Sequence, residues 1–328
     1  MKKTVILVVV VAALVIALLL GGLPLYSRVV YHRSQAATML AWQLDKQAYT
    51  GEADFKSYLA GKRAENALPY IIPPEVSFSV PVERYMYEAM PYFVLNAQEH
   101  PETLLIYFPG GSFIDQPRIV HWQFLDKMAA DTGAMILVPV YLKLPANDAQ
   151  TSYALTLDFY DAYVSGLDYD RLMFMGDSAG GGYALSMAMQ LRGAGLPEPE
   201  ALIVMSPWVD VTMSNPAIPE YEKRDPTLDS AMLAHLGALW AGDLGVTDPV
   251  VSPLYGDFTG LGHVTLIYSK SEVLCPDFDE TVRAMEADGV TVDTIVERGM
   301  FHVWPLYVAY SIPEVQDTFA AMAAIVAG

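Results

Sequence analysis

The sequence predicts an α/β fold with a mostly parallel central sheet flanked by helices. Short apolar runs alternate with helix-compatible stretches through most of the chain, as expected where each strand is followed by a helix that packs back onto the sheet. The apolar run at 172–175 leads into Gly-Asp-Ser-Ala-Gly at 176–180, a pattern typical of a sharp turn from a strand into a helix. Ligands of such sheets bind at the carboxyl ends of the strands, where Ser178 is expected.

The alternation assigns most of the elements. Strands are expected at 103–108, 134–140, 171–175, 201–205, 264–268 and 290–296. Helices are expected at about 118–132, 151–166, 178–193, 228–241, 276–288 and 313–327. Two further extended segments precede them, the alternating run 76–80 and the aromatic-rich run 85–95. Because Pro73 and Pro74 mark a boundary, we expect a polar helical cap segment at 27–75 and the α/β domain at 76–328.

Length and composition limit the class of protein. The 328 residues are 53% hydrophobic, which excludes disorder and predicts a large core. A formal net charge of -19 argues against a nucleic-acid partner, because phosphate binding needs a basic surface. The single cysteine, Cys275, excludes an internal disulfide framework and a cysteine-based zinc site. With no His, Cys and carboxylate cluster at metal-ligand spacing, we expect neither a metal nor a cofactor.

Residues 1–26 form a distinct N-terminal segment. Lys2 and Lys3 precede the uncharged run Thr4–Leu20, whose length is near the lower limit for a membrane span. No Ala-x-Ala cleavage site follows directly, so we expect an uncleaved signal anchor with the rest of the chain outside the cytoplasm. The alternatives are a cleaved signal peptide, which would give a secreted protein, and a buried helix. Basic residues flank both ends of the run and define its orientation only weakly.

Ser178 is the candidate nucleophile. Gly176 and Gly180 lie two residues to either side of it, where side chains would collide as the backbone doubles back. The alternative is an ordinary glycine-rich turn between a strand and a helix. A serine nucleophile also needs a base, an acid that orients the base, and donors for the oxyanion.

The base is expected to be His302. It lies in a loop after the final expected strand, the position from which this kind of sheet delivers its histidine. His235 falls inside an expected helix and His263 opens a strand. Surface or capping roles are therefore expected for the other histidines, which are His32, His100, His121, His235 and His263.

The orienting acid is expected in the loop after the strand at 264–268. Glu272 comes early in this loop, where a strand end directs its side chain toward the site. Asp277 is the alternative acid, but it follows Pro276 and has the pattern of a first-turn helix residue stabilised by the helix dipole. Glutamate can serve, because the acid only fixes the imidazole tautomer and stabilises the imidazolium.

The oxyanion donors are expected from two places. One is the N–H of Ala179, directly after the nucleophile. The other is the loop after the strand at 103–108, where Gly110 and Gly111 allow backbone N–H groups to approach an oxyanion closely. A plain Gly-Gly turn is the alternative, and the Ser178 motif disfavours it.

Together these residues resemble the hormone-sensitive-lipase-like branch of the α/β-hydrolases, over roughly residues 100–312 and more weakly before them. The segment 176–181 matches the family's serine motif, and 206–210 and 252–255 resemble two of its other stretches. There are two departures. Glu272-Val273-Leu274 stands where the family usually has Asp-Pro-Leu, and Pro109-Gly110-Gly111-Ser112 stands where it has His-Gly-Gly-Gly.

The resemblance implies a serine hydrolase that cleaves small carboxylic esters, with short- to medium-chain acyl groups, through an acyl-enzyme and without a cofactor. It also implies a helical lid built from the N-terminal segment and residues 221–242. Phe113, Trp122 and Trp208 are candidates to line a pocket under this lid, with core packing as the alternative. An amidase of the same fold and a catalytically silent binding protein are the alternative functions, the second supported only by the altered 109–112 motif.

Overall fold

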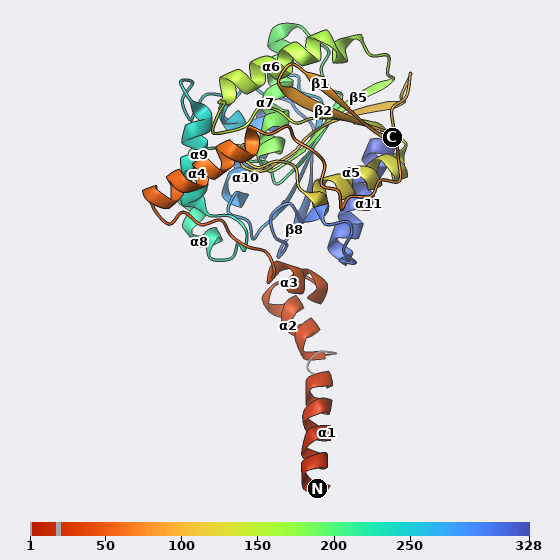
Figure 1. The fold of residues 1–328 in the computed structure, drawn as a ribbon, viewed down its shortest axis with the longest axis vertical. Coiled ribbons are helices and arrows are strands. Elements are labelled where there is room, and N and C mark those ends of the chain that lie inside the picture. Colours follow the sequence, from red (N-terminus) through yellow and green to blue (C-terminus); the bar gives the residue numbers. More distant parts are fainter. Residues whose placement is uncertain (1, 18–20) are drawn as a thin grey trace.

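One mixed sheet forms the centre of the molecule (Figure 1) in a computed structural model that describes residues 2–17 and 21–328. Within these residues the sheet has eight strands in the order β1-β2-β4-β3-β5-β6-β7-β8. The β2 strand is antiparallel to both neighbours, β1 and β4, while β4, β3 and β5 to β8 are parallel. The strand bounds are Val82–Tyr87 (β1), Met90–Leu95 (β2), Thr103–Phe108 (β3), Met135–Pro139 (β4), Arg171–Asp177 (β5), Ala201–Met205 (β6), His263–Ser269 (β7) and Val292–Glu297 (β8).

Helices cover both faces of this sheet. One apolar cluster joins the sheet to α6, α7, α9 and α10, and a second joins it to α5 and α11. The central strands β3 to β6 consist almost entirely of buried residues, as expected for parallel strands covered on both sides. The helix bounds are Lys2–Ala17 (α1), Leu23–Val30 (α2), Gln35–Ala41 (α3), Glu52–Asn66 (α4), Ile119–Thr132 (α5), Ala149–Ala162 (α6), Ala179–Ala194 (α7), Ile218–Glu222 (α8), Ser230–Ala241 (α9), Cys275–Ala287 (α10) and Pro313–Ala327 (α11).

The predicted α/β fold with a mostly parallel sheet is confirmed, and the strands at 103–108 and 201–205 have the predicted bounds. The extended segment at 76–80 is not a strand, and the first strand begins at Val82. Its backbone is held by a side chain instead of by a neighbouring strand, because Ser79 N and Val80 N both donate to the Asp126 carboxylate on α5. The predicted lid region 221–242 contains α9 and the end of α8.

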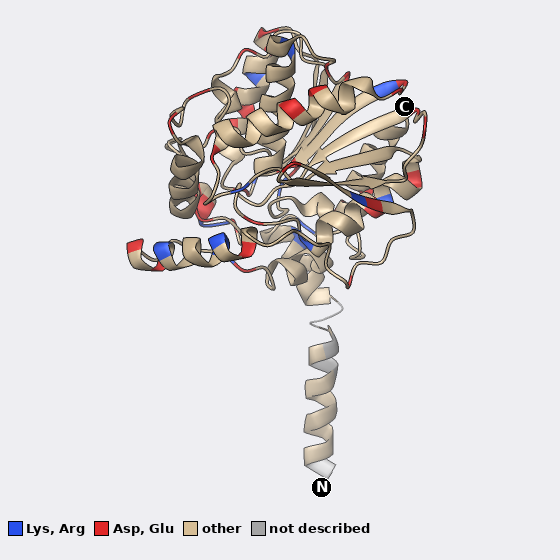
Figure 2. Ribbon diagram, turned by 45° about the horizontal axis from the view of Figure 1, so that its top comes forward, with Lys and Arg blue, Asp and Glu red and all other residues tan. Residues whose placement is uncertain are grey.

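The N-terminal helix α1 projects away from the rest of the molecule (Figure 1). Its apolar side chains face outward, with Val5 61% and Leu7 63% exposed. The charged side chains lie mainly on the body (Figure 2). No helix among the described residues is both long and apolar enough to cross a membrane, and residues 18–20, the end of the predicted anchor, lie outside the described residues.

Candidate active site

Ser178 lies at the tip of the turn from β5 into α7, with φ 52° and ψ -126°. Such a backbone conformation is strained for a residue with a side chain and is typical of functional sites. A Cβ atom at Gly176 would lie 2.3 Å from the Gly180 carbonyl oxygen, and one at Gly180 would lie 2.1 Å from the Phe108 carbonyl oxygen. The steric need for glycine at both positions is therefore confirmed.

The structure brings Ser178, His302 and Glu272 together in one hydrogen-bonded chain. His302 Nε2 lies 2.8 Å from Ser178 Oγ, and His302 Nδ1 lies 2.7 Å from Glu272 Oε2. All three side chains are buried, and Glu272 is completely inaccessible. A carboxylate can only accept, so a neutral His302 carries its proton on Nδ1 and leaves Nε2 free to accept the Ser178 proton.

The second oxygen of Glu272 is fixed by two further groups. Ser206 Oγ donates to Glu272 Oε1 at 2.9 Å, and the Ser269 backbone N–H donates to the same oxygen at 2.6 Å. These contacts hold the carboxylate in one rotamer, which in turn orients the imidazole. Sequence reasoning missed Ser206 in this role. Its place directly after the β6 strand, at the same sheet edge as Ser178, is the signal that points to it.

The alternative acid, Asp277, takes no part in this chain of contacts. It lies in the first turn of α10, and its Oδ1 accepts from Asn215 Nδ2 at 2.7 Å. Burial raises the pKa of Asp277 to about 6, with Asp210 and Glu280 contributing in the same direction.

Most of the other histidines lie in roles that fit the surface or capping prediction. His235 is near the Ala231 carbonyl on its own helix and stacks on Tyr49, and His263 pairs with Asp293 at the start of β7. His121 differs. It is 2% exposed and contacts the carboxylate of Asp177, so it is not a surface residue. The predicted capping role is confirmed, because its Nδ1 accepts from the Arg118 N–H at the start of α5. Among the described residues, no group of three or more His, Cys, Asp or Glu is arranged to hold a metal ion.

One of the predicted donors in the oxyanion loop, residues 109–113, is wrong. The Gly110 N–H donates to Asp177 Oδ1 at 2.9 Å, so it is already engaged and does not face an oxyanion. In the described part of the chain, no hydrogen bond uses the N–H of Gly111, Ser112 or Ala179. Ala179 is the first residue of α7, where N–H groups have no acceptor within the helix. On the side of the site formed by the loop, the remaining N–H groups belong to Gly111, with φ 122°, and Ser112, with φ 50°.

Asp177 holds this loop through a buried network that the sequence analysis missed. Its Oδ1 accepts from Tyr107 Oη at 2.6 Å as well as from Gly110, and its Oδ2 lies 3.3 Å from His121 Nε2. The Arg118 N–H donates to His121 Nδ1, which leaves the His121 proton on Nε2, facing Asp177. Burial alone would raise the pKa of Asp177, but His121 and the donated hydrogen bonds lower it below its usual value.

A cavity of about 380 Å³ opens over Ser178 and His302. The N-terminal segment contributes Gln43, Leu44 and Tyr58 to it, and α9 contributes Met232, Leu233 and Leu236. The three aromatic candidates for its lining are instead buried in the core. Phe113 stacks on Trp240, with ring centroids 4.3 Å apart, and on Trp208, while Trp122 packs against Tyr70 and Phe93.

Comparison with known proteins identifies the family. The sequence matches the family described as alpha/beta hydrolase fold over residues 105–306. It is 30% identical to the putative acetyl-hydrolase LipR of Mycobacterium tuberculosis, covering 68% of this chain and 72% of that protein, and 29% identical to an acetyl-hydrolase of Streptomyces hygroscopicus, covering 66% and 72%. A putative esterase from Staphylococcus aureus superposes with a TM-score of 0.78 at 25% identity, covering 84% of this chain and 93% of that one. The chain therefore belongs to the alpha/beta hydrolase fold family, in its hormone-sensitive-lipase-like branch of esterases.

Proposed function

We propose that this protein hydrolyses carboxylic esters, with short- to medium-chain acyl groups, through an acyl-enzyme on Ser178. The observation that supports the proposal most strongly is the chain of contacts from Ser178 Oγ through His302 to Glu272, at 2.8 and 2.7 Å. Relatives named acetyl-hydrolase and esterase support the same reaction class. The cavity of about 380 Å³ over Ser178 gives an ester room to reach the hydroxyl.

In the first half of the reaction, Ser178 Oγ attacks the acyl carbon while His302 Nε2 takes its proton. Glu272 stabilises the imidazolium that forms, and Ser206 and the Ser269 N–H keep the carboxylate in place. The negative charge on the carbonyl oxygen is stabilised by the N–H groups of Ala179 and Gly111, and the N–H of Ser112 is a further candidate donor. When the tetrahedral intermediate collapses, the carbon–oxygen bond to the alcohol breaks and His302 gives the leaving oxygen its proton.

In the second half, water replaces the alcohol. His302 Nε2 removes a proton from the water, which attacks the acyl carbon, and the same N–H groups hold the oxyanion again. Collapse releases the carboxylic acid and returns the proton from His302 to Ser178 Oγ.

Turnover of p-nitrophenyl acetate and p-nitrophenyl butyrate tests the proposal. Ser178→Ala should reduce kcat by about 10⁴–10⁶, because it removes the atom that forms the covalent bond. A fluorophosphonate probe should label the wild-type protein and leave this variant unlabelled. Hydrolysis by the wild type separates an esterase from a silent binding protein, and equal labelling of the two proteins would contradict the role of Ser178.

We also propose that Thr4–Leu20 anchors the protein in a membrane, with the α/β domain outside the cytoplasm. The run is uncharged, and the side chains of Val5, Ile6 and Leu7 are more than half exposed on α1. Exposed apolar side chains also follow on α2 and α3, at the base of α1. They are Leu25, Tyr26, Val29, Val30 and Met39.

Two truncations test this anchor, and the contacts of Arg33 distinguish them. Arg33 is buried, and its guanidinium donates to the carbonyl of Gly299 at 3.0 Å, in the loop that carries His302. Removal of residues 1–26 keeps this contact and should give a soluble, active enzyme, whereas removal of residues 1–38 should lower activity. The full chain should stay with membranes after a high-salt wash. Intact-mass analysis that finds a mature chain starting near residues 22–38 would overturn the anchor in favour of a signal peptide.

A further inference from the structure

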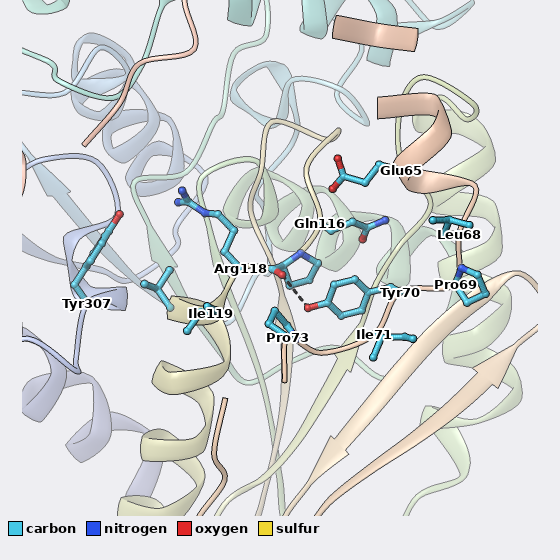
Figure 3. A pocket seen from close by; sticks show the side chains of 12 residues that line it. Glu65, Leu68, Pro69, Tyr70, Ile71, Pro73, Gln116, Arg118, Ile119 and Tyr307 are labelled. Atoms are coloured by element: carbon cyan, nitrogen blue, oxygen red, sulfur yellow. Dashed lines mark hydrogen bonds between the residues drawn. The ribbon is translucent and has the colours of Figure 1, made fainter. Parts of the chain in front are cut away.

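A second, mainly apolar hollow lies beside the catalytic cavity (Figure 3). We call it the outer groove, with a volume of about 640 Å³. Its apolar walls come from the segment after α4 and from the start of α5, and they include Leu68, Pro69, Ile71, Pro73, Ile119 and Val120. Leu68 is 69% exposed and Ile71 is 73% exposed, so apolar surface here faces water when the groove is empty.

The outer groove is preformed, because hydrogen bonds hold its two walls together. Tyr70 Oη donates to the Pro117 carbonyl at 2.8 Å, the bond drawn as a dashed line in Figure 3. Asn66 Nδ2 donates to the carbonyls of Ile114 and Leu144, and Gln116 Nε2 donates to Asn66 Oδ1. A rigid apolar surface can bind an apolar chain without first having to order itself.

The outer groove and the catalytic cavity adjoin. Gln116, Arg118 and Tyr307 line both of them, and in Figure 3 Arg118 lies between the other two. Among the described residues Arg118 has no ion pair, and its long apolar stem can cover part of a passing hydrocarbon chain. A substrate that fills the cavity over Ser178 can therefore extend past these three residues into the groove.

The position of Tyr307 indicates which part of the ester enters the groove. His302 must lie next to the leaving oxygen, because it gives this oxygen its proton. His302, Val303 and Tyr307 line the cavity from one loop, so the groove is reached on the side of the proton donor. The side chains of Met232, Leu233 and Leu236 on α9 line the cavity as well and offer an apolar wall to the acyl chain. Resting on the proposed ester hydrolysis, we propose that the outer groove binds the alcohol part of the substrate, and that this alcohol carries an extended apolar chain.

Two ester series measured with the whole protein test this assignment. One lengthens the alcohol, from ethyl to octyl acetate, and the other lengthens the acid, from p-nitrophenyl acetate to p-nitrophenyl octanoate. In the alcohol series kcat/KM should rise by up to about fourfold for each methylene that enters the groove. Ile71→Asp and Leu68→Asp place a charge in the groove at exposed positions where folding is not endangered.

Both variants should lower the ratio of kcat/KM for octyl acetate to that for ethyl acetate by about tenfold or more, and leave the slope of the acyl series unchanged. Met86→Asp is the matched control, because it places the same charge at a half-exposed apolar residue on the edge strand β1, away from the groove. It should keep the wild-type ratio.

Three results would overturn the assignment. A flat alcohol series in the wild type would show that the groove does not bind the alcohol chain. If Ile71→Asp and Leu68→Asp changed the dependence of kcat/KM on acyl-chain length, the groove would bind the acyl chain instead. Failure of the wild type to hydrolyse any member of either series would overturn the proposed ester hydrolysis and the substrate assignment with it, whereas the first two results would leave ester hydrolysis intact.

Discussion

The two halves of the active site are fixed by different means. On one side, the groups expected to react are hydrogen-bonded to one another directly, from Ser178 through His302 to Glu272. On the other side, the loop that carries the Gly111 N–H is held in place by a hydrogen bond to a neighbouring side chain. Asp177, the neighbour of Ser178, holds Gly110 and with it the loop that presents Gly111.

This difference explains how the oxyanion loop is held in place although Pro109 stands where the family has a histidine. Pro109 has no N–H to donate, and its carbonyl accepts from Tyr141 Oη at 2.8 Å. Asp177 holds the loop instead, and Tyr107 and His121 hold Asp177 in turn. We call the hydrogen-bonded chain from Ser178 through His302 to Glu272 the relay, and we expect substitutions in it to cause the largest losses of rate. Substitutions of the residues that hold the loop should weaken oxyanion stabilisation and lower the rate by smaller factors.

The relay should be the more sensitive half. Glu272→Gln should lower kcat by about 10³–10⁴ with little change in KM, because the amide no longer fixes the His302 tautomer or stabilises the imidazolium. Steady-state kinetics with p-nitrophenyl butyrate measures both constants. Asp277→Asn, in the first turn of the helix that follows Glu272, is the control and should keep the wild-type kcat. The reverse ranking of these two variants would assign the acid to Asp277.

Gly111→Val tests the loop directly. Gly111 has φ 122°, and a Cβ atom there would lie 2.8 Å from the Asp115 carbonyl oxygen, so a branched side chain must displace the loop. Loss of one oxyanion donor costs on the order of 10²–10³ in kcat, and this is the loss we expect. Circular dichroism checks that the variant is folded. Pro109→His is the matched change and should stay within about tenfold of the wild type; a wild-type rate for Gly111→Val would remove the loop from the mechanism.

Asp177→Asn tests the support of the loop. The amide oxygen can still accept from one donor, but the negative charge that faces His121 and Tyr107 is lost. A small displacement of the loop costs up to about 10² in rate, so kcat should fall by roughly 10- to 100-fold while KM changes little. Tyr107→Phe removes one of the hydrogen bonds to Asp177 and should give a smaller decrease. Unchanged kcat in both variants would show that the loop keeps its position without the network.

Much of the fold was predictable because its central strands, β3 to β6, are buried on both faces. Continuous apolar runs between turn signals identify such strands, which is why the bounds of β3 and β6 were predicted correctly. The segment 76–80 has the alternation of a strand but none of the pairing, because its N–H groups bind the Asp126 carboxylate. Periodicity records which side chains are buried and does not record where the backbone hydrogen bonds go.

The candidate site also contains residues that the sequence predicted and residues that it did not. Ser178, His302 and Glu272 follow from chain order within the fold, and the structure places them within hydrogen-bonding distance of one another, although their catalytic roles stay predictions. Gly110 was assigned to the oxyanion from its residue type and its place in the loop after β3, while its N–H donates to Asp177. His121 caps α5, as one of its two predicted roles requires, but its contact with Asp177 was not predicted. No local pattern shows that a residue in the first turn of α5 lies against the end of β5.

The smallest expected effect concerns stability and not rate. Burial raises the pKa of Asp277 to about 6 from an ordinary value of 3.8. The folded state thus keeps its proton between these pH values while the unfolded state loses it, so this group destabilises the protein progressively as the pH rises from about 4 to about 6. At pH 8 the penalty amounts to roughly 3 kcal/mol at most, since one pKa unit corresponds to about 1.4 kcal/mol. Asp277→Asn can still accept from Asn215 and should unfold at a higher urea concentration than the wild type at pH 8, but at the same concentration at pH 4. Glu286→Gln removes an exposed carboxylate of α10 that does not contribute to the Asp277 shift, and it should show no such pH-dependent gain. An equal gain in both variants would assign the effect to the overall negative charge of the protein.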